Sequence, residues 1–300
     1  MRRTVQWLFL LFLIILSNST VSAKERDTVF VSILPQKFFV QQISGESLQV
    51  EVMVKPGASP ATYEPKPSQM RKLSKSSLYF SVGVPFENVW LERLTDVNPE
   101  MTIIHTDKGI HKLTMAAHHH EEDGHEEDGH EEEAREPTTG LDPHIWLSPV
   151  LVKKQAKIIG ESLIARFPER EVHFRKNLAL FLSRVDELHG DLQEILRDKK
   201  GTRFMVFHPS WGYWAHEYGL EQVAVEMEGK NPKPAQLQEL IEQAREENIH
   251  VIFAQPQFSV KSAKVIAREL KGTVITIDPL AENWFENMRH VADIFKKTVQ

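Results

Sequence analysis

Cysteine is absent from all 300 residues of this chain. That absence excludes a disulfide framework, a thiolate metal site and a lipid anchor attached through cysteine. If the chain binds a metal, the ligands must therefore be histidine imidazoles and carboxylates.

Long hydrophobic runs are also scarce. The apolar run Trp7–Leu16 has ten residues, and a membrane-spanning helix needs ~20. The run follows Arg2 and Arg3 and precedes the small-residue segment Val21–Ala23, which is the layout of a secretory signal peptide. A retained membrane anchor is the alternative. We expect residues 1–23 to be removed, leaving a mature periplasmic protein without a lipid anchor.

Basic charge is not in excess either. The net charge is −6, with 36 lysines and arginines against 42 acidic residues. Residues 118–136 alone carry −9, so the rest of the chain is close to neutral at +3. This balance gives no electrostatic basis for binding nucleic acid.

The chain contains one segment, residues 118–133, made almost entirely of histidine, glutamate and aspartate. Five histidines and nine carboxylates stand between positions 118 and 133. Such a segment cannot bury enough apolar surface to order itself, so we expect a solvated, mobile loop over residues 118–136. Imidazole binds zinc, copper and nickel ions, and the carboxylates concentrate cations. We interpret the loop as a metal-capturing element; an acidic linker is the alternative. Its histidines are His118, His119, His120, His125 and His130.

The ~277 residues after the leader suggest two domains. Strand-like and helical segments alternate in both halves, which predicts an α/β fold of two lobes, each a mostly parallel sheet with helices on both faces. We expect the first lobe over 24–148, interlobe helices over 149–200 and the second lobe over 201–300. The predicted strands are 28–33, 49–54, 78–82, 101–105, 203–207, 222–226, 251–254 and 273–277.

Apolar residues recur every three or four positions between Phe174 and Ile195, and nothing breaks the pattern from residue 168 to 198. The pattern predicts one helix of about 31 residues, roughly 46 Å long. We expect a rigid strut that joins the lobes; a coiled-coil segment is the alternative, but charge pairing is not sustained. Ligands of such folds bind at the carboxyl ends of the sheets.

Three residues fall where an interlobe cleft would lie. His208 and Asp278 end the predicted strands 203–207 and 273–277, and His144 stands just before the interlobe helices. Two imidazoles and a carboxylate are ordinary ligands for zinc. Each residue could instead have a purely structural role. His144 and Asp278 could cap helices, and His208 could be a hydrogen-bonded core histidine.

The motifs around these residues resemble a known family, the zinc- and manganese-binding solute-binding proteins of bacterial ABC importers, called cluster A-I or cluster 9. The histidine-rich loop is typical of its zinc-selective branch. The resemblance covers nearly the whole mature chain and implies that His144, His208 and Asp278 are metal ligands. It also implies an importer permease and its ATPase as partners. The segments that carry it are Asp142–Pro149, Phe207–Tyr213, Asp278–Leu280, Gly83–Glu87 and Pro234–Leu237.

One motif departs from the family pattern. The family has a histidine ligand in Gly-x-x-Pro-His-x-Tyr-Glu-Pro, and this chain has Ala61 at the histidine position. Glu64 is the nearest carboxylate and a candidate ligand, with a structural hydrogen bond as its alternative role. A water molecule, Glu228, a loop histidine or His105 could complete the site instead.

We interpret the chain as a receptor, not an enzyme, that captures Zn²⁺ in the cleft and delivers it, as a monomer, to an ABC importer. A Mn²⁺ or Fe²⁺ receptor is the nearest alternative, since oxygen-rich sites suit manganese. Two other classes stay open. One is a secreted zinc hydrolase, although the chain has no His-Glu-x-x-His helix. The other is a passive zinc buffer that uses only the histidine-rich loop.

Overall fold

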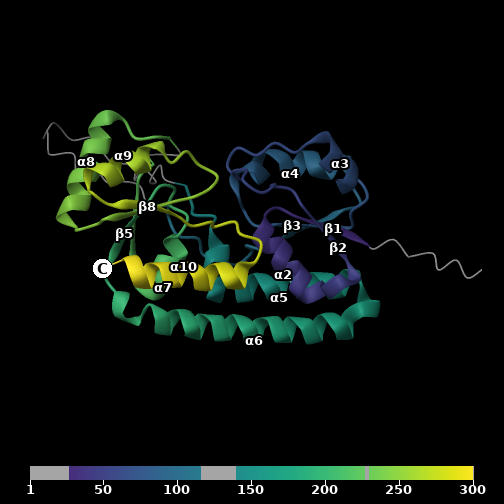
Figure 1. The fold of residues 1–300 in the computed structure, drawn as a ribbon. Coiled ribbons are helices and arrows are strands. Elements are labelled where there is room, and N and C mark those ends of the chain that lie inside the picture. The colour runs from purple at the N-terminus through teal and green to yellow at the C-terminus, as the bar shows by residue number, and fades with distance from the viewer. Residues whose placement is uncertain (1–26, 116–139, 227–229, 300) are drawn as a thin grey trace, which may run out of the picture.

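The computed structural model describes residues 27–115, 140–226 and 230–299. These residues form two α/β lobes that lie side by side (Figure 1). The first lobe has a parallel four-stranded sheet in the order β2-β1-β3-β4. Its elements are β1 (Thr28–Val31), α2 (Leu34–Ser44), β2 (Gln49–Val52), α3 (Pro67–Leu73), β3 (Leu78–Ser81), α4 (Pro85–Val97) and β4 (Thr102–His105).

The second lobe repeats this plan with a parallel sheet in the order β6-β5-β7-β8. Its elements are β5 (Arg203–Val206), α7 (Gly212–Tyr218), β6 (Glu221–Ala224), α8 (Pro234–Glu246), β7 (Val251–Ala254), α9 (Lys261–Glu269), β8 (Thr273–Thr276) and α10 (Trp284–Thr298). The predicted fold class is confirmed, and each predicted strand is found with ends that differ by at most two residues.

Strand β5 illustrates why helices cover both faces of its sheet. Phe204 packs against Phe295 of α10, with ring centroids 4.8 Å apart, whereas Met205 belongs to a separate core cluster with residues of α8 and α9. Successive side chains of a strand point to opposite faces. An uninterrupted apolar strand therefore needs a helical layer on each side.

The long helix is shorter than predicted. Helix α6 (Glu171–Ile195) has 25 residues, and 3₁₀ turns at Pro168–Arg170 and Arg197–Lys199 flank it. Such turns at helix ends keep nearly the same spacing of side chains, so the apolar pattern runs through them and hides the true ends. Helix α6 runs beneath both lobes (Figure 1) and packs against α2, α10 and α5 (Pro149–Arg166). One core cluster extends from the first-lobe strands through α5 and α6 to α10.

Some predictions concern segments outside the described residues, namely the leader 1–23, the histidine-rich loop 118–136 and Glu228. Within the described ranges, no helix is both long and apolar enough to cross a membrane.

A buried carboxyl group fixes the start of α4 in the first lobe. Glu87, only 2% exposed, accepts hydrogen bonds from the backbone N–H of Val82 at 2.9 Å and of Gly83 at 2.7 Å. It also accepts one from the Ser32 hydroxyl. Burial raises the pKa of Glu87 to about 7, and these hydrogen bonds act in the opposite direction.

We expect Glu87→Ala to lower the free energy of unfolding by about 3 kcal/mol, because it leaves buried donors without an acceptor. Glu87→Gln should cost less, since the amide oxygen can still accept. The sign of the pH dependence follows from the raised pKa: the folded state holds a proton that the unfolded state releases between pH 4.5 and about 7. The wild type should therefore lose stability relative to Glu87→Gln as pH rises through that window. Urea unfolding at pH 5 and pH 7.5 measures both the cost of each substitution and its pH dependence. Equal losses in the free energy of unfolding for Glu87→Ala and Glu87→Gln would contradict this account.

Candidate metal site

A small cavity of about 60 Å³ lies between the lobes, at the carboxyl end of the second-lobe sheet. His144 and His208 are part of its wall, and Ala61 and Pro85 line it from the first lobe. Most of the other lining side chains are apolar: Pro60, Val84, Met115, Pro143, Trp146, Phe258, Pro279 and Leu280. Two imidazoles thus stand in an environment that largely excludes water, which strengthens any interaction with a cation.

The imidazole of His144 is held by the acid two residues before it. His144 is 8% exposed and Asp142 2% exposed. Asp142 Oδ1 lies 2.6 Å from His144 Nδ1 and also accepts the backbone N–H of His144 at 2.8 Å. The carboxylate therefore fixes both the ring orientation and the proton on Nδ1.

His208 is held in the same way by a more distant acid. It follows β5, and its Nδ1 lies 2.6 Å from Oε1 of Glu226, just beyond β6. Gln255 accepts its backbone N–H at 3.1 Å and donates to its carbonyl oxygen at 2.7 Å. The ring of Phe258 stacks on the imidazole with centroids 4.6 Å apart. Backbone, ring plane and tautomer of His208 are all restrained.

The free nitrogens of the two imidazoles point at each other. Nε2 of His144 and Nε2 of His208 are 3.3 Å apart. With both Nδ1 atoms donating to carboxylates, both Nε2 atoms carry lone pairs, so this contact is favourable only with a proton or a cation between them. Two nitrogens bound to tetrahedral zinc at ~2.05 Å would be about 3.3–3.4 Å apart.

A metal ion fits this position better than a proton does. Burial lowers the pKa of His208, the hydrogen bond that its Nδ1 donates to Glu226 raises it, and the nearby His144 lowers it further. A neutral imidazole is the form that binds metal. The pair is therefore prepared for a divalent cation near neutral pH.

Asp278 is close to this pair in the fold but does not join it. Its Oδ1 accepts hydrogen bonds from Gln257 Nε2 at 2.8 Å and from the backbone N–H of Leu280 at 2.9 Å. It lines a neighbouring hollow of about 250 Å³ instead of the histidine cavity. In the described parts of the chain, no three histidine or acidic side chains lie close enough to hold one ion. The structure thus brings together two of the three predicted ligands.

The remaining predicted candidates are placed elsewhere. Glu64 is exposed, because the adjacent Tyr63 turns inward and donates to Gln69 Oε1 at 2.6 Å. Glu64 is not among the residues that line the histidine cavity, and its role as a ligand stays a prediction. His105 is also exposed, and its Nδ1 lies 2.9 Å from Ser81 Oγ.

Two tryptophans tie the His144 segment to the Asp278 segment. Trp146 Nε1 donates to the carbonyl oxygen of Pro279 at 2.7 Å, and Trp284 Nε1 donates to that of Trp146 at 2.8 Å. Both indoles are 1% exposed. Asn287 Nδ2 also donates to the carbonyl oxygen of Asp278 at 2.8 Å. These bonds fix the spacing between segments that are more than 130 residues apart in sequence.

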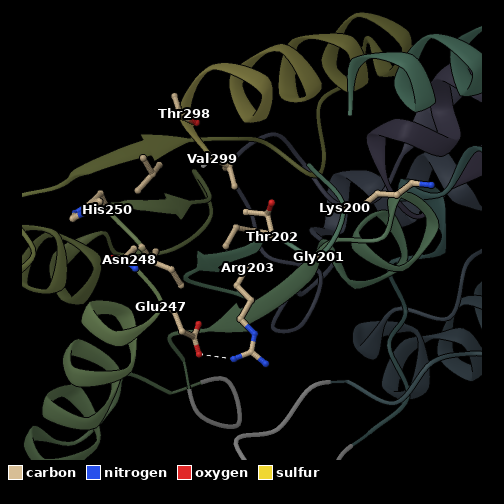
Figure 2. A pocket seen from close by; sticks show the side chains of 12 residues that line it. Lys200, Gly201, Thr202, Arg203, Glu247, Asn248, His250, Thr298 and Val299 are labelled. Carbon is tan, nitrogen blue, oxygen red and sulfur yellow. Dashed lines mark hydrogen bonds and ion pairs between the residues drawn. The ribbon is translucent and has the colours of Figure 1, made fainter. Parts of the chain in front are cut away.

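A larger hollow of about 380 Å³ lies at the opposite, amino-terminal edge of the second-lobe sheet (Figure 2). Figure 2 shows Arg203 and Glu247 pointing toward each other, and their ion pair is 2.7 Å long. Arg203 also pairs with Glu221 at 2.7 Å, and His250 Nδ1 lies 3.3 Å from the carbonyl oxygen of Leu270. Arg203 and Glu247 thus pair within the second lobe, and His250 is the only histidine among the described residues that line this hollow. The interlobe cavity, where two imidazoles face each other, is therefore the candidate site.

Reasoning from the sequence missed the residues that hold the histidines. Asp142 was noticed only as part of a motif, Glu226 only as a strand end, and Gln255 not at all. Asp142 could have been found, because an acid two residues before a candidate ligand is within reach of its ring. Glu226 is 18 residues from His208, and only the pairing of β5 with β6 brings them together.

Comparison with known proteins places this geometry in a family. The profile of the family described as ZnuA, zinc-uptake complex component A, periplasmic, matches residues 29–298. The chain belongs to this family. The family consists of metal-binding receptors of transport systems and not of enzymes. The resemblance inferred from the motifs is therefore confirmed, as is the prediction that the chain is not an enzyme.

Individual ZnuA-like proteins agree with this assignment. A crystal structure of ZnuA is 37% identical, covers 91% of this chain and 99% of its own, and superposes with a TM-score of 0.82. The high-affinity zinc uptake system protein ZnuA of Bacillus subtilis is 26% identical over 257 residues, 84% of this chain and 78% of that protein. FpvC from Pseudomonas aeruginosa, described in complex with Mn²⁺, shares the fold at 21% identity and a TM-score of 0.76, covering 92% of this chain and 99% of FpvC.

Proposed function

We propose that this chain is a periplasmic receptor that captures Zn²⁺ between its lobes and delivers it to the permease and ATPase of an ABC importer. The observation that carries the proposal is the convergence of two carboxylate-held imidazoles with their Nε2 atoms 3.3 Å apart. In this proposal His144 and His208 are direct ligands and Asp278 supplies the negative charge of the site. Zinc is the cargo, bound and released without a reaction.

Zinc is favoured over manganese by the ligand chemistry. Imidazole nitrogens suit zinc, whereas manganese prefers carboxylates and carbonyl oxygens. The named relatives include zinc uptake proteins. A protein of the same fold is described with Mn²⁺, so the fold alone does not select the metal, and a Mn²⁺ receptor is the alternative that the experiment must test.

The ends of the histidine-rich segment support a role for it near the site. The backbone N–H of Met115 donates to the carbonyl oxygen of Gly140 at 3.0 Å, and Thr114 forms a bridge with Leu141. Met115 is also part of the cavity wall. Described residues on the two sides of residues 116–139 are thus paired with each other, and one of them lines the cavity. We propose that the histidines of the segment 118–136 gather zinc for the interlobe site.

Removal of residues 118–136 tests the receptor against the passive buffer. The shortened mature protein should fold, because the deletion joins Ala117 to Pro137 and the flanking residues Met115 and Gly140 are already hydrogen-bonded. We expect competition titrations with a chromophoric chelator to find one tight Zn²⁺ site that prefers zinc to Mn²⁺. Loss of all tight binding would show instead that only the loop binds metal, and tighter Mn²⁺ binding would assign manganese as the cargo.

A further inference from the structure

The loop that follows β7 contacts two of the three proposed metal-site residues. Gln255 and Phe258 hold the backbone and ring of His208, as described above. Between them, Gln257 donates through Nε2 to Asp278 Oδ1 at 2.8 Å. A single short segment, Gln255–Phe258, is therefore bonded both to a histidine of the pair and to the nearby acid.

Gln257 stands at the boundary between two hollows. It lines the interlobe cavity together with His144 and His208, and it also lines the neighbouring hollow that contains Asp278. Gln257 thus links the two hollows, because its NH₂ group is bound to Asp278 while the residue also lines the cavity of the histidine pair.

The amide of Gln257 has one group paired and one group unpaired. A carboxylate oxygen only accepts, so the NH₂ group must face Asp278, which fixes the orientation of the amide. Its Oε1 is then buried and finds no hydrogen-bond partner within residues 27–115, 140–226 and 230–299. Buried carbonyl oxygens are nearly always paired, with protein, water or a cation.

We propose that Gln257 is a third ligand of the captured cation, with its amide oxygen bound to the metal and its NH₂ group bound to Asp278. The inference rests on the proposed function, because it requires the cation to sit at the histidine pair. The negative charge of Asp278 polarises the amide through the N–H···O⁻ bond and makes Oε1 a better donor. Asp278 is then a positioning residue behind Gln257.

This assignment makes Gln257 a determinant of metal selectivity. An amide oxygen is a harder donor than imidazole, and hard oxygen donors favour manganese relative to zinc. We therefore expect Gln257→His to raise the ratio of zinc to manganese affinity.

The deciding experiment is competition titration of the mature protein lacking residues 118–136 with Zn²⁺. Gln257→Leu should weaken zinc binding about tenfold or more, as for the loss of one donor. The thermal midpoint of metal-free Gln257→Leu should stay close to that of the parent, because removal of a buried unpaired oxygen offsets the lost hydrogen bond from Nε2 to Asp278. Gln238→Leu, the same exchange at an exposed position of α8, is the matched control and should change neither quantity.

A double-mutant cycle distinguishes two roles of Gln257, direct binding of the metal and positioning of Asp278. If Gln257 is a ligand, Gln257→Leu should still weaken zinc binding in an Asp278→Ala background, by a smaller factor than with Asp278 present because the carboxylate orients and polarises the amide. If Gln257 only positions Asp278, the second substitution should have no further effect, and the proposal is overturned. His208→Ala is titrated in parallel. Unchanged zinc affinity in that variant would refute the histidine site itself, which is a different outcome from failure of the Gln257 assignment.

Discussion

His208→Ala is expected to weaken zinc binding at the interlobe site by a factor on the order of 10²–10³. Structural zinc sites with four protein ligands bind with apparent free energies of about 10–16 kcal/mol, or roughly 2.5–4 kcal/mol for each ligand. Each 1.4 kcal/mol is about a tenfold change in affinity. The loss of zinc affinity should be near the upper end of this range. In the variant, Nε2 of His144 would have to hold the ion without Nε2 of His208, which faces it at 3.3 Å in the wild type.

The measurement is competition titration of the protein lacking residues 118–136, so that loop histidines cannot mask the loss. Circular dichroism and thermal melting of the metal-free variant provide the control for folding. The wild-type protein should keep its affinity to a lower pH than free histidine would allow, because burial lowers the pKa of His208 and delays proton competition. Equal zinc affinities for wild type and variant would place the metal elsewhere in the molecule.

Ala61→His is expected to tighten zinc binding, by about ten- to a hundredfold. Ala61 lines the same cavity as His144 and His208, so a third imidazole introduced there can reach an ion between them. The gain in zinc affinity should be smaller than the loss of affinity in His208→Ala. Ala61 is exposed, and an exposed imidazole loses rotamer freedom when it binds the metal. No neighbouring group is arranged to hold its Nδ1, in contrast to the two native histidines, as far as the described residues show.

Thr62→His is the matched control for this gain. Thr62 is adjacent and exposed, and it is not among the residues that line the cavity. A histidine there adds the same local metal affinity without reaching the site. Similar gains from both substitutions would indicate surface binding of zinc. A gain restricted to Ala61→His would place the ion in the cavity beside this residue.

The sequence by itself determined the elements of the fold. Uninterrupted apolar strands such as β5 and β7 require cover on both faces, and strand–helix alternation then permits little besides a parallel sheet. The ends of the long helix were not determined, because the 3₁₀ turns at Pro168–Arg170 and Arg197–Lys199 preserve the apolar spacing. Local periodicity specifies which residues are buried more firmly than it specifies where a helix stops.

The tertiary structure decided how the site is built. His144 and His208 could be named from their motifs, but the 3.3 Å approach of their Nε2 atoms depends on how the two lobes pack. The pairing of His208 with Glu226 depends on the neighbouring strands β5 and β6. The hydrogen bond of Gln257 to Asp278, and the place of Gln257 in the wall of the histidine cavity, depend on the loop after β7. A ligand type is a property of one residue and is visible in the sequence, whereas a coordination geometry is a distance between segments far apart in the chain, and only packing of the whole core sets such distances.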